Sequence, residues 1–246
     1  MNIFGIKDSA NFTVKYKSGA NKGKVFLYSD YATVATNEWT SEQVYAKSKN
    51  VNAIRWDFGR ASTLKVDMEI FDLKWIAMLF GTEFVAGAKD ILKREVLTLG
   101  SDKTATLVGT VKEGSLVVHK LEDDGISNGE ELTLTSGYTI TDKKITVTGG
   151  TEGDKIVAYY LEAKTDVQTL TISADKYPEN FEIIADSMIR DTAGEDKFVQ
   201  INYLNVKPKS QFTLTLDASN ITTISAEFDI LKDSGSSDMA TYTIYK

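Results

Sequence analysis

The sequence predicts a mainly β fold, an antiparallel β-sandwich or barrel with one short flanking helix. Its 246 residues include only two prolines, and turn signals such as Asp124-Gly125, Asn128-Gly129 and Gly149-Gly150 recur along it. Between these turns, apolar and polar residues alternate, as at Ile224, Ala226, Phe228 and Ile230. Short turns and a period of two are typical of antiparallel strands, not of alternating helices and strands.

The N-terminal part is predicted to run from an extended segment beginning near residue 44, through residues 55–59, into an alternating strand. The apolar positions of that strand are Leu64, Val66, Met68 and Ile70. We expect Trp56 to pack in the core, since aromatic side chains within strands usually do.

A single short helix is expected over residues 73–80. Asp72 is a good N-cap, and Gly81 is suited to end the helix in the left-handed conformation. Trp75 is expected in the core. The apolar stripe of the helix is Leu73, Ile76, Ala77 and Phe80.

Residues 109–164 are predicted to form a small inserted β-sandwich, because they hold short strand patterns separated by Gly, Asp and Asn turns. The flanking parts, residues 1–108 and 165–246, would then form one main domain. A continuous single-domain β structure is the alternative.

After the insert, residues 181–190 suit a strand buried on both faces, and residues 191–197 suit a turn. Residues 198–206 and 210–218 are expected to pair as a hairpin around Pro208, followed by a strand over residues 221–231. Residues 239–245 alternate again and are expected to form a terminal strand or arm.

The composition restricts the class of protein. Apolar residues make up 42% of the chain and charged residues 26%, which is typical of a globular protein. There is no cysteine, so disulfides and thiolate sites are excluded. No apolar run approaches the length of a membrane-spanning helix, and the N-terminus lacks a signal-peptide pattern, so we expect a protein made in a cytoplasm with no membrane partner.

The charge argues against nucleic-acid recognition. With 28 basic and 35 acidic residues, the net charge is −7, whereas nucleic-acid binders concentrate Lys and Arg. An acidic surface repels phosphate, although many proteins are mildly acidic for solubility alone.

No catalytic, metal-binding or cofactor-binding residues are indicated, and we expect no enzyme. His119 is the only histidine and lies in a strand pattern. Residues 19–25 lack the glycine spacing of a phosphate loop, and the acidic residues 122–131 lack the pattern of a helical calcium loop. Both segments are expected to be turns.

Three segments together, residues 44–81, 181–191 and 211–218, resemble the tail tube (major tail) proteins of tailed bacteriophages. The resemblance covers residues 40–100 and 165–232 and rests on the order and character of the segments. It implies two packed sheets with a flanking helix, hexameric rings that stack into a tube, and a lumen lined by strands from all six subunits.

The resemblance also implies specific regions of contact. A long hairpin over residues 31–52 would reach the next ring, and the first dozen residues and the segment after Leu231 would be arms. Trp39 lies in a polar stretch expected between two strands, which favours a subunit contact. The candidate inter-subunit or inter-ring contacts are Asn37, Glu38, Trp39, Glu42, Tyr45 and Lys47.

The implied partners are other copies of the chain and other tail proteins, namely the tape measure, the baseplate or tail tip, and the terminator. Phage DNA would pass through the lumen without specific binding during genome delivery. The protein would be made in the bacterial cytoplasm and reside in the virion tail, with residues 109–164 projecting from the outer wall.

Two other readings of the sequence stay open. Another phage structural protein, such as a capsid decoration or baseplate component, would have the same β-rich, cysteine-free composition. A β-sandwich carbohydrate-binding module would use exposed aromatics as stacking platforms.

Overall fold

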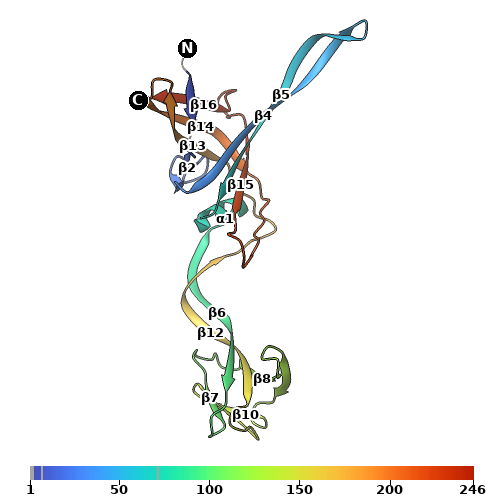
Figure 1. Cartoon of the computed structure of the whole chain (residues 1–246), viewed down its shortest axis with the longest axis vertical. Helices are drawn as coiled ribbons and strands as arrows, with labels where there is room; N and C mark the ends of the chain where they lie inside the picture. The colour runs from blue at the N-terminus through green and yellow to red at the C-terminus, as the bar shows by residue number, and fades with distance from the viewer. Residues whose placement is uncertain (1–2, 7, 71) are drawn as a thin grey trace. The chain divides into compact units, whose positions relative to one another are not determined.

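The computed structural model describes residues 3–6, 8–70 and 72–246 and divides the chain into two compact units. Unit 1 comprises Met1–Phe84 and Leu170–Lys246, and unit 2 comprises Val85–Thr169. Both are built from antiparallel strands, which confirms the predicted mainly β class (Figure 1).

Unit 1 contains one nine-stranded sheet. Seven strands follow one another in the order β3-β2-β13-β14-β15-β5-β4, while β1 pairs with β13 and β16 pairs with β14. The strands are β1 (Phe4–Ile6), β2 (Asn11–Tyr16), β3 (Val25–Ser29), β4 (Ala32–Ser48), β5 (Val51–Met68), β13 (Phe181–Asp191), β14 (Asp196–Pro208), β15 (Ile224–Ile230) and β16 (Ala240–Tyr245).

The core of unit 1 is formed by inward-facing residues of these strands and by one helix. Leu64, Val66 and Met68 of β5 alternate with polar residues and are fully buried, as the period of two predicts. Ile70, the last predicted position of that pattern, lies beyond β5 and is exposed. The ring of Phe228 packs edge-on against that of Trp75, which confirms the predicted core position of this tryptophan.

Helix α1 (Leu73–Phe80) has the predicted caps. The Asp72 side chain accepts a hydrogen bond from the Lys74 amide at 2.8 Å, and Gly81 is left-handed with φ of 62°. The buried face agrees with the predicted stripe only at Ala77, because Leu73 is exposed. Trp75, Met78 and Leu79 are the other buried residues of the helix. These three residues have i, i+3 and i+4 spacing, which places them on one side of the helix.

The C-terminal part corrects two predictions. β14 runs to Pro208 and pairs with β13, β15 and β16, so the predicted hairpin of residues 198–206 with 210–218 is wrong. Residues 209–223 are assigned to no strand. β13 buries mainly alternate residues rather than both faces, since its polar side chains such as Glu182 bond across the opposite face to Asn202.

The predicted N-terminal arm includes residues 1, 2 and 7, which lie outside the described residues. Within the described part of that segment, the three residues of β1 pair with Ile189, Arg190 and Asp191 of β13, and β2 begins at Asn11.

Unit 2 consists of two sheets that share an apolar core. One sheet has the order β10-β11-β7 and the other the order β6-β12-β8-β9. The strands are β6 (Phe84–Thr98), β7 (Thr104–Thr106), β8 (Val117–Leu121), β9 (Asn128–Leu132), β10 (Tyr138–Thr141), β11 (Lys144–Val147) and β12 (Lys155–Leu170). Its bounds are wider than residues 109–164, because β6 pairs with β12 and β7 pairs with β11.

A partly buried hydrogen-bond cluster joins β6, β12 and the segment after β7. The Tyr160 hydroxyl donates to the Glu95 carboxylate, which also accepts from the Val108 amide at 2.9 Å, and the Gly109 amide donates to the Tyr160 hydroxyl at 2.9 Å. Burial alone would raise the pKa of Glu95, but these hydrogen bonds outweigh it and lower the pKa. Burial and the neighbouring carboxylate raise the pKa of Tyr160 to about 12.

We predict that Gly81→Ala destabilises unit 1 by at least about 2 kcal/mol. A Cβ at Gly81 would be strained by the positive φ and would collide with the Tyr177 carbonyl. Thermal unfolding followed by tryptophan fluorescence reports on this unit, since all three tryptophans precede Val85. Gly23→Ala is the control: φ is 80°, but nothing lies within 4 Å of the added carbon, so only about 1 kcal/mol should be lost. Equal effects would contradict the role of the Tyr177 contact.

We also predict that Tyr160→Phe destabilises unit 2 by about 1–3 kcal/mol, because Glu95 loses a hydrogen-bond donor in a partly buried site. Amide hydrogen exchange of β6 and β12 measures this loss. Tyr159→Phe is the matched control, since the neighbouring hydroxyl bonds only to exposed partners, Arg94 and Asn128.

The pKa of Glu95 is lower in the folded state than in the unfolded chain. Its contribution to stability is therefore present above the ordinary carboxyl pKa and is lost as pH falls through the lowered value. Glu95→Gln should remove the part of the acid dependence of amide hydrogen exchange in unit 2 that arises from this carboxylate. An unchanged acid profile would show that this carboxylate does not stabilise the unit.

Candidate assembly surfaces

The most prominent feature of unit 1 is the hairpin of β4 and β5, which extends as a two-stranded ribbon beyond the other strands (Figure 1). Lys49 and Asn50 form its turn, and both have positive φ, at 49° and 67°. Two left-handed residues are characteristic of a type I′ turn, whose twist matches that of the flanking strands. The tip is therefore a regular tight turn.

The hairpin has two halves that differ in the number of strands that pair with them. In the inner half, residues 32–40 pair with residues 61–68, and β5 there also pairs with β15. In the outer half, residues 42–48 pair with residues 51–58, and no other strand joins this ladder among the described residues. An isolated two-stranded ribbon is marginally stable in water, so the outer half is expected to gain stability from a partner.

A β-bulge separates the two halves. The register passes from Thr40↔Ala61 to Glu42↔Phe58, so Gly59 and Arg60 lie opposite Ser41 alone. Gly59 has φ of 60°, the left-handed conformation that glycine adopts without strain in such bulges. The extra residue increases the local twist and so sets the direction of the outer half.

The outer half is amphipathic. Residues directly opposite each other in an antiparallel ladder share a face, so Val44 lies beside Trp56 and Ala46 beside Ile54. The opposite face carries Gln43, Tyr45, Arg55 and Asp57. We name the first face the outer apolar face; it consists of Val44, Ala46, Ile54, Trp56 and Phe58.

The outer apolar face is open to solvent. The exposed fractions of Val44, Ile54, Trp56 and Phe58 lie between 51% and 54%. Covering the exposed half of each side chain would contribute about 1 kcal/mol per residue. Contiguous exposed apolar side chains of this kind mark interaction surfaces in proteins. Trp56 was predicted in the core, and the structure corrects this: its side chain faces away from the sheet core of its own chain.

The six candidate contacts from the sequence all lie on β4, which includes Trp39, expected between two strands. Trp39 and Tyr45 are 39% and 40% exposed, and Glu38, Glu42 and Lys47 are exposed as well. Of the six, Glu38 and Glu42 alternate onto the same side of β4 as the outer apolar face, and Glu42 lies opposite Phe58. The alternation of Ile54, Trp56 and Phe58 is the signal that could have identified this face.

Asn37 has a role within the chain. Its amide nitrogen donates to Ser62 Oγ at 2.9 Å and to the Thr63 carbonyl at 2.8 Å. Its Oδ1 accepts from Trp39 Nε1 at 2.7 Å and from the Tyr242 hydroxyl at 3.2 Å. Asn37 thus ties β4 to β5 and to the C-terminal strand β16.

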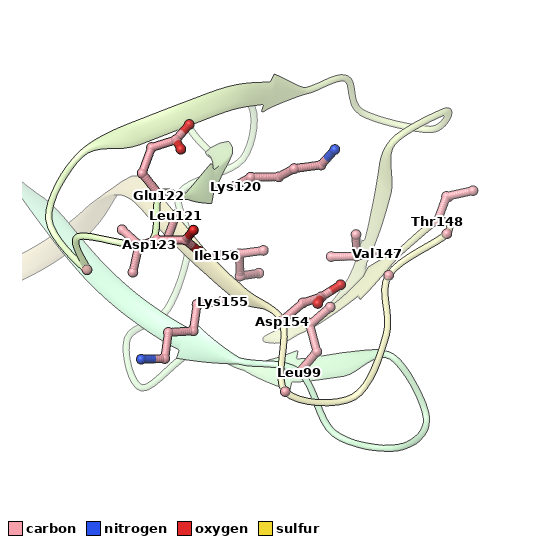
Figure 2. Close-up of a pocket in the computed structure, with 14 residues that line it drawn as sticks. Leu99, Lys120, Leu121, Glu122, Asp123, Val147, Thr148, Asp154, Lys155 and Ile156 are labelled. Atoms are coloured by element: carbon pink, nitrogen blue, oxygen red, sulfur yellow. The ribbon is translucent and has the colours of Figure 1, made fainter.

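A hollow of about 500 Å³ lies in unit 2 (Figure 2). Its walls come from residues 120–123, 147–150 and 153–156, with Leu99 and Gly125. Two of its charged groups have partners: Lys120 lies 2.6 Å from Glu130, and Asp154 accepts two hydrogen bonds from Thr151. No aromatic ring lines the hollow among the described residues, so it lacks a stacking platform for a sugar.

The remaining residues considered for chemistry are structural in the described part of the chain. His119 lies in β8 with Nδ1 at 3.3 Å from the Gly129 carbonyl oxygen. Asp124 accepts from the amides of Ile126 and Ser127 at 2.8 Å, which closes a turn and, with the Ser127 hydroxyl, lowers the pKa of Asp124. Residues 3–6, 8–70 and 72–246 contain no cluster of three or more His, Cys, Asp or Glu placed to hold a metal ion. They also contain no helix long and apolar enough to span a membrane.

Comparison with known proteins places the chain in a family. Residues 4–244 match the model of the YomU/Tube protein family. No curated protein matches the chain. The chain therefore belongs to the YomU/Tube protein family, which confirms the resemblance to phage tail tube proteins and identifies it as a tube-like structural protein.

Proposed function

We propose that copies of this protein assemble into hexameric rings that stack into the tail tube of a phage, the conduit for genome delivery into the host. Membership of the tube family supports a structural role in the virion tail and interaction with other tail components. The rings, their stacking and passage of the genome are the specific part of the proposal.

The observation that carries the proposal is the outer apolar face of the β4–β5 hairpin. Four large exposed apolar side chains lie on a ribbon that no other described strand joins, and such a face favours a covering surface. A second copy in the next ring is that surface in this proposal. The hairpin and the surface that receives it are different parts of the molecule, so the contact is heterologous and repeats along an axis into a filament.

The candidate contacts divide by chemistry. Val44, Ile54, Trp56 and Phe58 would supply the apolar centre of the contact, and Glu42, Tyr45 and Lys47 its polar rim, because interfaces generally have an apolar core and a polar rim. Glu38 and Trp39 would contact a neighbour near the base of the hairpin. Asn37 would act indirectly, by holding β4 against β5 and β16.

The net charge fits a conduit for DNA. At −7 the chain repels phosphate, so DNA would slide through the lumen without specific binding. The partners at the ends and inside of the tube would be the tape measure, the terminator and the baseplate or tail tip.

Unit 2 would be an outer domain that projects from the tube wall, the role proposed from the sequence for residues 109–164. It has its own core, separate from that of unit 1. A domain with its own core does not depend on the tube contacts for folding.

Negative-stain electron microscopy over a concentration series tests the proposal. The wild-type chain should form hollow rings or stacked tubes. The double variant Trp56→Ser, Phe58→Ser should require at least a tenfold higher concentration to assemble, since losing two apolar contacts removes about 2 kcal/mol of contact energy.

The matched control is the double variant Gln43→Ser, Asp57→Ser, a directly opposite pair on the other face of the ladder, which is also exposed and should assemble at nearly the wild-type concentration. Both variants should unfold at the wild-type temperature, because these side chains lie outside the core. Discrete particles of the wild-type chain at every concentration would argue against the tube.

We further predict that replacing Val85–Thr169 by a Gly/Ser linker leaves tube formation intact, because this unit contributes nothing to the core of unit 1. Electron microscopy and tryptophan fluorescence measure assembly and folding of the shortened chain. A folded protein that forms no tubes would place unit 2 in the tube contacts.

A further inference from the structure

Residues 209–223 connect β14 to β15. This segment leaves the sheet, although both of these strands belong to it. The Lys209 amide donates to the Glu227 carbonyl at 2.8 Å, one residue beyond the paired Pro208↔Phe228 position. Beyond Lys209, residues 210–223 make no backbone-to-backbone hydrogen bond with the described residues. The contacts there are made by side chains, such as Thr222 Oγ1 donating to the Thr215 carbonyl at 2.7 Å.

The sequence of this segment is nevertheless that of a strand. Gln211, Thr213 and Thr215 alternate with Phe212, Leu214 and Leu216, and residues 210–216 contain no charge, glycine or proline. Threonine and large apolar residues in period two are typical of strands. We name residues 211–216 the unpaired segment.

The apolar side of the unpaired segment is largely uncovered. Phe212 packs against Phe80 of α1, but Leu214 and Leu216 are 47% and 86% exposed. Ile221 on the returning chain is 74% exposed. A strand pattern with free backbone groups and exposed leucines is suited to join another sheet by strand addition.

The same chain has an edge that can accept a strand. β4 ends the sheet order, so the side of β4 away from β5 has no strand partner among the described residues. Its first six residues, from Ala32 to Asn37, carry no charge and no proline, the devices that usually block an open edge. A groove of about 390 Å³ runs beside them, lined by apolar side chains that include Val34, Leu64 and Tyr203.

We propose that the unpaired segment of one copy adds as a strand to the outer edge of β4 in a second copy. The inference rests on the proposed function, since it requires copies to assemble. Within one chain, the described structure does not pair the unpaired segment with β4. The unpaired segment leaves from the β14 side of β15, whereas β4 lies on the far side of β5, so two strands separate them.

Such a contact uses two different surfaces of each copy, the unpaired segment and the β4 edge. Every copy therefore offers one of each to its neighbours, and the contact can repeat around a ring. β3, at the other end of the strand order, is a weaker acceptor because it has only five residues, against 17 in β4.

Cysteine cross-linking tests the pairing directly, since the chain has no native cysteine. Thr213→Cys is combined in turn with Thr33→Cys, Val34→Cys or Ala35→Cys, so that neighbouring registers are sampled. Directly paired strand residues lie within the Cα separation of a disulfide. After mild oxidation of assembled protein, at least one pair should give a ladder of covalent multimers on a denaturing gel.

The controls are each single-cysteine variant, which can give no product beyond a dimer, and Thr213→Cys with Tyr28→Cys on β3. A ladder from the β3 pair, with none from the β4 pairs, would overturn the assignment to β4. Dimers alone from every pair would overturn the head-to-tail contact.

Amide hydrogen exchange of the wild-type chain gives a second measurement. Residues 211–216 should exchange freely in the dilute monomer and become at least a hundredfold slower after assembly. Assembled tubes in which these amides still exchange freely would overturn this inference and leave the proposed function intact.

Non-tubular oligomers with protected amides and a β4 cross-link would overturn the proposed function and leave the strand-addition inference intact. A chain that stays monomeric at every concentration would overturn both proposals.

Discussion

The structure of unit 1 depends on one constraint, that the N–H and C=O groups along every strand must find partners. β13 and β14 satisfy theirs on both sides, with β2 and β1 along one flank and β15 and β16 along the other. β4 has a ladder on one side only, and its outer half relies on β5 alone. The well-paired centre carries the apolar core, while the incompletely paired strands lie where the chain can meet another molecule.

A strand that contributes both to the core and to a surface for another molecule must change its environment along its length. β5 does so at Gly59. On one side of the bulge, Leu64, Val66 and Met68 face the core; on the other, Ile54, Trp56 and Phe58 face solvent. The bulge interrupts the register between the two stretches, so the inner ladder is held by β15 while the outer ladder is free to follow its own direction. Without cysteine, the inner part is held by packing and hydrogen bonds such as those of Asn37.

Features decided by local chemistry could be predicted from the sequence. The α1 helix is capped by Asp72 and Gly81 as expected, because an N-cap carboxylate and a left-handed glycine act over only a few residues. The existence of most strands also followed from their period of two. Strand partners did not: the pattern of residues 210–218 is correct for a strand, yet β14 pairs with β13, β15 and β16 instead. Alternation determines which residues share a face, but pairing is decided by distant parts of the chain.

The candidate site shows the same limit of prediction from the sequence, and there the wrong prediction is itself informative. Trp56 was expected in the core because an aromatic residue in a strand usually packs against its own chain, and the pattern cannot specify which molecule supplies the cover. Trp56 and Leu214 both follow core-like alternation and both remain exposed in the single chain. In a protein that belongs to a tube family, such residues are the ones that the proposed assembly would cover with another copy. Disagreement between a strand pattern and the burial in one chain therefore marks the surfaces that the proposed assembly would bury.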